Sequence, residues 1–235
     1  MPVCLDRELI MNFRRDYCFM GTFFQKLSRT GILLMLAGIM ILVSTSSDLL
    51  ISFKSPKTFD DAVADGGLEA GDRVKGQVPF LLDAFALEET WQEDKSNNSR
   101  TPKKTSRYYY VLPCGDGCAG LSIGASNAGA ADRLVEETYE YLTTADGPEP
   151  SAELVLDARV AVMDEELSGW FQEELEDYYD YTPQDIAAMG TFLMIEPCSF
   201  TAVRIGFALG AALTVTGALV CVKRWRRFSD EAFAA

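Results

Sequence analysis

TGILLMLAGIMILVSTSS, residues 30–47, is the stretch that decides the fold, because it holds no charged side chain over 18 consecutive positions. A second uncharged run of 18 residues, IGFALGAALTVTGALVCV, covers positions 205–222. A helix of about 20 apolar residues crosses the ~30 Å hydrocarbon core of a lipid bilayer. We therefore predict two transmembrane helices, at residues 30–51 and 202–222, with a lipid bilayer around both.

Basic side chains lie beyond the outer end of each apolar run. They are Arg14, Arg15, Lys26, Arg29, Lys223, Arg224, Arg226 and Arg227. Lys and Arg beside a transmembrane helix favour the cytoplasmic side, so we predict a multi-pass plasma-membrane protein with both termini in the cytoplasm. Its other parts are a basic and aromatic N-terminal segment (1–29), an extracytoplasmic domain (52–201) and a basic tail (223–235).

Two alternatives to this topology stay open. The first run could be a cleaved signal peptide with Ser44–Ser47 as its cleavage region, although a basic segment of about thirty residues is long for that class. The chain would then have a single span. Either run could instead be the core helix of a soluble protein, but their lengths and flanking arginines favour the membrane.

The segment between the two runs is strongly acidic. Residues 53–203 contain 29 Asp and Glu against 11 Lys and Arg. Such a domain repels phosphate backbones, so we expect no nucleic-acid partner. The chain also contains no histidine, which excludes Ser-His-Asp and Cys-His catalysis and imidazole metal ligands.

Alternating and helical hydrophobic patterns predict an α+β domain. Predicted strands cover residues 74–80, 107–112, 121–125, 154–162 and 192–195, and the first could continue through Ala86. Predicted helices cover 129–144 and 164–179, and short capped helices start after Thr58 and Thr182. Five strands with a helix between the third and fourth favour a small OB-like barrel with added helices. An open α+β sheet fits the same order of elements.

Cys114 and Cys118 are the sharpest candidates for chemistry. They flank three residues, Gly-Asp-Gly, between two predicted strands. A structural disulfide and two free thiols are equally compatible with this spacing, and a redox or metal role is a third alternative. Zinc would need further ligands, and no histidine is present to supply one. We therefore expect no catalytic residue, metal or cofactor.

Two further patterns have mainly structural interpretations. Gly206 and Gly210 lie one turn apart on the second apolar helix, a spacing that lets another helix approach closely. The partner helix could be the first span, through Gly31 or Gly38, or another copy of the chain. The acidic positions of 164–180 lack the spacing of a calcium loop, so a solvated helix face is the simpler interpretation. On that helix we expect Leu167, Trp170, Phe171, Leu175 and Tyr178 to form the buried stripe.

Four stretches of the middle segment carry a resemblance. They are GDRVKG (71–76), YYYVLP (108–113), GLSIG (120–124) and the helical ADRL and ETYEYL of 131–142. With both apolar runs, they resemble an uncharacterised family of bacterial two-span membrane proteins, mostly from gut Firmicutes, classed as a domain of unknown function. The resemblance implies the two-span architecture and no particular activity.

Together these observations predict a membrane-anchored, non-enzymatic protein whose outer domain binds a protein or an envelope component. One alternative is an envelope thiol-redox protein or enzyme that uses the Cys114/Cys118 loop. Another is an accessory subunit of a transporter or sensor that assembles, or self-associates, through the face of Gly206 and Gly210.

Overall fold

The structure, a computed structural model, describes residues 29–91, 93–94, 99–145 and 147–233. The predicted N-terminal segment therefore lies outside the described residues, except for Arg29. The chain divides into two units. One consists of residues 1–49 and 201–235 and contains the apolar helices, and the other is an α/β domain of residues 50–200.

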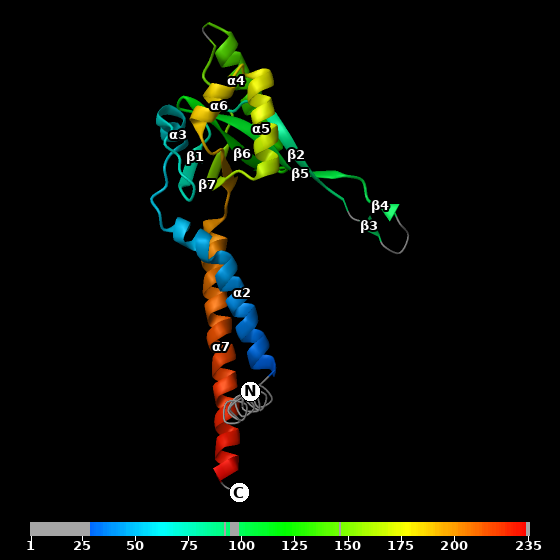
Figure 1. The fold of residues 1–235 in the computed structure, drawn as a ribbon, viewed down its shortest axis with the longest axis vertical. Coiled ribbons are helices and arrows are strands. Elements are labelled where there is room, and N and C mark those ends of the chain that lie inside the picture. The colour runs from blue at the N-terminus through cyan, green and yellow to red at the C-terminus, as the bar shows by residue number, and fades with distance from the viewer. Residues whose placement is uncertain (1–28, 92, 95–98, 146, 234–235) are drawn as a thin grey trace, which may run out of the picture. The chain divides into compact units, whose positions relative to one another are not determined.

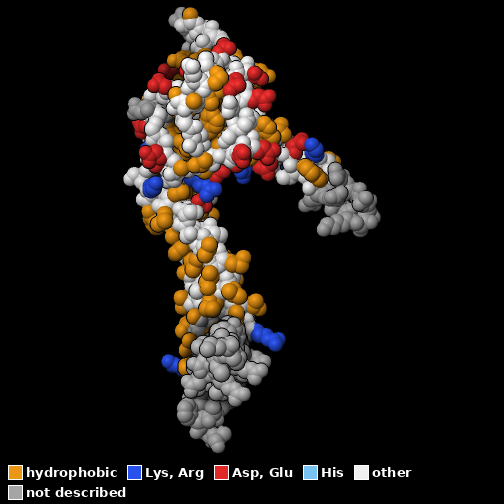
Figure 2. Space-filling model, in the orientation of Figure 1, with side chains coloured by type: hydrophobic (Ala, Val, Ile, Leu, Met, Phe, Trp, Pro, Cys, Tyr) orange, Lys and Arg blue, Asp and Glu red, His pale blue; other side chains and the backbone are white. Residues whose placement is uncertain are grey.

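Two long helices form where the apolar runs occur: α2 (Arg29–Ser52) and α7 (Phe200–Phe233). Both are long and apolar enough to cross a membrane. Large apolar side chains such as Leu33, Met40 and Leu209 are exposed on them, and Figure 2 shows hydrophobic side chains along the helices. Only 6% of the apolar window of α2 and 17% of that of α7 are buried within the described residues. α7 continues without a break through most of the predicted tail.

The described residues of the α/β domain form four helices and eight strands, drawn in Figure 1. In chain order they are α3 (Phe59–Asp65), β1 (Arg73–Gln77), β2 (Ala84–Thr90), β3 (Glu93–Asp94), β4 (Ser99–Arg100), β5 (Lys104–Cys114), β6 (Gly117–Gly124), α4 (Ala128–Thr143), β7 (Val155–Val162), α5 (Glu165–Tyr178), α6 (Pro183–Met189) and β8 (Leu193–Pro197). Six strands form one sheet in the order β1-β7-β8-β6-β5-β2. β6 and β8 are parallel, and the other neighbours are antiparallel. β3 and β4 form a separate two-stranded ribbon.

This topology replaces the predicted five-stranded OB-like barrel with an open six-stranded sheet. β1 and β2 lie at opposite ends of the strand order, so the described residues do not close a barrel. Two features account for the difference. β2 is a strand of its own rather than a continuation of β1, and β8 inserts between β7 and β6. Order along the chain does not determine such non-local pairing.

Helices cover the sheet on both faces. α3 and α4 pack on one face with Phe59 and Leu134, and α5 and α6 pack on the other with Phe171 and Ile186. Successive side chains of β5 alternate between these two cores. Tyr110 belongs to the first core and its neighbour Tyr109 to the second. A strand buried on both faces explains why YYYVL is a continuous apolar run.

Side-chain caps fix the predicted starts of two short helices. The Thr58 side chain accepts a hydrogen bond from the Asp61 amide at the start of α3. Thr182 and Asp185 form a capping box at the start of α6, with Pro183 in the first turn. These interactions satisfy amides that have no partner within the helix. Both predicted caps are confirmed.

Each edge of the sheet is protected in a different way. At β1 the backbone of Lys57 pairs with the strand, accepting from the Lys75 amide at 2.9 Å and donating to the Arg73 carbonyl at 2.8 Å. β2 has register shifts between Ala84 and Ala86 and between Glu88 and Glu89. Bulges and charged side chains on an edge strand disfavour indiscriminate strand pairing.

Candidate functional site

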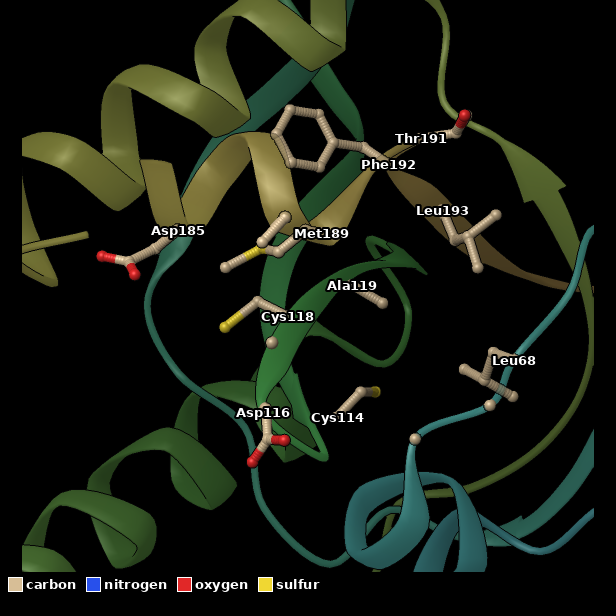
Figure 3. Close-up of a pocket in the computed structure, with 14 residues that line it drawn as sticks. Leu68, Cys114, Asp116, Cys118, Ala119, Asp185, Met189, Thr191, Phe192 and Leu193 are labelled. Atoms are coloured by element: carbon tan, nitrogen blue, oxygen red, sulfur yellow. The ribbon is translucent and has the colours of Figure 1, made fainter. Parts of the chain in front are cut away.

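The β5–β6 hairpin places Cys114 and Cys118 on opposite faces of the sheet. Its turn contains two residues rather than three, because Cys114 pairs with Gly117 and Pro113 pairs with Cys118. Gly115, with φ +56°, supplies the left-handed conformation that the first position of such a turn requires. Figure 3 shows the two thiols pointing away from each other, and each packs against a different core.

This arrangement leaves both cysteines as free thiols, so the candidate Cys114–Cys118 disulfide is not formed. Burial, and then the neighbouring Cys118, raises the pKa of Cys114 to about 12. Burial also raises the pKa of Cys118, and the Tyr181 hydroxyl, 3.6 Å from its sulfur, opposes that shift. Because the thiolate is the reactive form, the protonated thiols are poor nucleophiles. The geometry does not favour thiol-redox chemistry.

The cleft around these thiols has a volume of about 560 Å³ and lies between the hairpin, α6 and the residues after α3. Its wall includes the carboxylates of Asp116 and Asp185, shown in Figure 3. Asp185 accepts hydrogen bonds from the hydroxyl and amide of Thr182, which lower its pKa. The Asp185 carboxylate therefore has a structural role as part of the N-terminal cap of α6. Within the described part of the chain, no group of three acidic or cysteine side chains could hold a metal ion.

The helix-packing residues lie where α2 and α7 meet. A Cβ atom on Gly210 would lie 3.1 Å from the carbonyl oxygen of Gly38, whereas a Cβ on Gly206 would reach only Thr45 at 3.7 Å. Gly210 thus occupies a close approach and Gly206 an ordinary contact. Gly217, which the sequence analysis did not single out, is a closer approach than Gly210: a Cβ there would lie 2.6 Å from the carbonyl oxygen of Gly31 on α2.

A second surface, also missed from the sequence, lies between β2, α4 and α5. It contains two hollows, of about 420 Å³ and 560 Å³, which share Glu174 and Tyr178. We call it the α5 groove and define it by its principal lining residues: Asp83, Leu87, Asp132, Glu136, Trp170, Glu173, Glu174, Asp177 and Tyr178. Hollows of this size fall in the range of ordinary ligand sites, about 300–1,000 Å³.

Exposed apolar side chains gather in the α5 groove. Tyr178 is 75% exposed, Leu87 52% and Trp170 44%. The prediction that Trp170 and Tyr178 belong to the buried stripe of α5 is therefore wrong for both. Phe171 and Leu175 alone occupy the fully buried positions of that helix. α5 buries Phe171 and Leu175 against the sheet, whereas Trp170 and Tyr178 lie at exposed positions of the helix and line the groove.

Carboxylates surround those side chains. Burial, together with nearby Asp83 and Asp177, raises the pKa of Glu174. Asp132 accepts a hydrogen bond from the Tyr110 hydroxyl at 2.7 Å. Among the described residues that line the two hollows, none is Lys or Arg. The groove therefore combines exposed aromatic surface with negative charge that its own lining does not neutralise.

Comparison with known sequences identifies the family. The sequence model of a family described as a domain of unknown function (DUF8577) matches residues 20–222. The chain belongs to this family. The match covers both uncharged apolar runs and the whole α/β domain of this DUF8577 member. No curated protein and no solved structure matches the chain.

The DUF8577 match confirms the resemblance to a family of unknown function. Its description assigns no activity, so the chemistry of this DUF8577 domain must be argued from its own surfaces. One signal in the sequence pointed to the α5 groove. Acidic residues occupy positions 173, 174, 176 and 177, so few positions in this half of α5 can face the core, and its aromatic side chains are left at the surface.

Proposed function

We propose that this protein is a non-enzymatic, two-span membrane anchor whose α/β domain binds a protein partner outside the cytoplasm through the α5 groove. The observation that carries the proposal is the gathering of exposed Leu87, Trp170 and Tyr178 around hollows beside the β2 edge. Tyr and Trp in partly enclosed pockets dominate the binding energy of many protein interfaces.

The placement of the domain rests on the flanking charges. Basic residues lie beyond the outer end of each apolar run, and such residues favour the cytoplasmic side of a membrane. Both termini then lie in the cytoplasm of the plasma membrane and the acidic α/β domain lies outside. Large apolar side chains exposed along α2 and α7 support their insertion in lipid.

Site-specific photo-cross-linking in intact cells tests the proposal. A photoreactive amino acid replaces Leu87, inside the groove, in the full-length chain. The matched control carries the same amino acid at Val155, an apolar strand residue that is 66% exposed and lines neither hollow. We expect a defined protein adduct from position 87 and not from position 155. Equal adduct patterns from both positions, or none from position 87, would refute the proposal.

A further inference from the structure

The charge of the α5 groove restricts the chemistry of its partner. Six carboxylates line the two hollows, and none of the described lining residues is basic. The rise in the pKa of Glu174 reflects burial and repulsion from Asp83 and Asp177. Without a counter-charge these side chains oppose one another, and a positively charged ligand relieves that repulsion.

Charged residues on another part of the same domain are arranged differently. On β1, β7 and β8, the Arg73 guanidinium makes hydrogen bonds to Asp157 at 2.6 and 2.9 Å. Arg159 similarly contacts Glu196 at 2.7 Å. Those charges neutralise each other within the domain. The lining of the α5 groove contains no comparable pair.

The aromatic side chains add a second requirement. Trp170 and Tyr178 line the same hollow as Glu173, Glu174 and Asp177. Aromatic faces attract Lys and Arg cations, and carboxylates attract them more strongly at short range. Leu87 offers apolar surface on the opposite wall, on β2. The site is therefore complementary to a cation and to an apolar side chain next to it.

From this complementarity we infer that the α5 groove binds a polypeptide segment of another protein in which Lys or Arg alternates with apolar residues. The inference rests on the proposed function and names the partner's chemistry. The aromatic and aliphatic walls hold the apolar side chains and the alkyl stems of the basic ones. The carboxylates hold the ammonium or guanidinium groups, so the affinity falls as salt screens them.

A defined peptide tests the inference with the full-length chain in nanodiscs of zwitterionic lipid. The probe is a fluorescent peptide of three Lys-Ala-Leu repeats, and its control has Glu in place of Lys. Fluorescence anisotropy should show binding of the Lys peptide alone, weakened by added salt. The double variant E173Q/E174Q and the single variant Tyr178→Ala should each weaken binding roughly tenfold, a typical effect of a central interface residue.

A charge-matched variant separates a specific groove from general attraction to an acidic protein. Glu149 and Glu153 are exposed and line neither hollow, so E149Q/E153Q removes the same number of negative charges outside the groove. It should change the affinity by less than about threefold. Equal losses in the two double variants, or no effect of Tyr178→Ala, would overturn the inference.

The cross-link at position 87 distinguishes this inference from the proposed function. A heterologous adduct that still forms at high salt and in E173Q/E174Q would support the proposed function. It would refute the inference that the partner segment is cationic. An adduct with twice the mass of the chain would identify a second copy as the occupant and overturn it as well. No adduct would refute both statements.

Discussion

Replacement of two aromatic residues of α5 by alanine should affect the stability of the domain very differently. Phe171 is fully buried and contacts the rings of Phe85 and Phe192 edge to face, at 5.0 and 5.2 Å between ring centroids. Replacing a buried Phe by Ala costs about 3–5 kcal/mol, which lowers the melting temperature of a domain of this size by about 6–20 °C. Tyr178 is 75% exposed on the same helix, and surface substitutions change stability by about 0.5 kcal/mol or less.

Thermal unfolding of the full-length chain in detergent, followed by near-ultraviolet circular dichroism, measures both effects. Phe171→Ala should melt well below the wild type because it removes the side chain that fixes α5 to the sheet. Tyr178→Ala should melt within about 2 °C of the wild type. If Tyr178→Ala were as damaging as Phe171→Ala, Tyr178 would belong to the core, and the groove as a binding surface would be refuted.

Three further predictions concern the thiols, the helix pair and pH. Cys114, with its pKa raised to about 12 mainly by burial, should resist iodoacetamide at neutral pH in the folded chain and react after denaturation; rapid alkylation without denaturant would contradict the raised pKa. Gly217→Ala should destabilise the helix pair by about 1–3 kcal/mol through overpacking, because its Cβ would lie 2.6 Å from a backbone oxygen of α2. Gly206→Ala should leave the stability of the pair unchanged, because its Cβ would have its nearest contact at 3.7 Å. Thermal melts followed by circular dichroism in micelles compare the two variants. Glu137 has a lowered pKa because the backbone amides of Ser151 and Ala152 donate hydrogen bonds to its carboxylate; the stabilising effect of this carboxylate is complete above its pKa in the unfolded chain and is lost as the pH falls through its lower pKa in the folded chain. The protection factor of the Ala152 amide, which is the intrinsic exchange rate at each pH divided by the observed rate, should therefore fall on acidification, and an unchanged protection factor in Glu137→Gln would count against the interaction.

Local signals predicted most of the elements in this chain. The caps at Thr58 and Thr182 and the amphipathic pattern of α4 each depend on residues within one or two turns. The alternation around Val160 likewise predicted β7. Two long uncharged runs predicted α2 and α7, because the length and composition of an apolar helix are read directly from the sequence. The residues that determine these elements lie close together in the sequence, so the elements can be predicted from a single sequence without an alignment.

What the sequence did not predict depends on non-local geometry. β8 lies between β7 and β6 because Ile195 pairs with both Leu121 and Val160, residues far apart in the chain. The thiols failed to meet because a turn shorter by one residue places Cys118 on the other face. Trp170 looked like a core residue by its spacing, and only the position of α5 on the sheet shows that it is exposed.

The cross-link from position 87, measured with and without Tyr178→Ala, tests the binding role of the α5 groove most directly. Leu87 and Tyr178 line the same hollow but lie on β2 and α5. We expect a heterologous adduct that disappears in Tyr178→Ala while the melting temperature of the domain stays unchanged. An adduct of undiminished yield in a correctly folded Tyr178→Ala chain would contradict a binding role for the α5 groove.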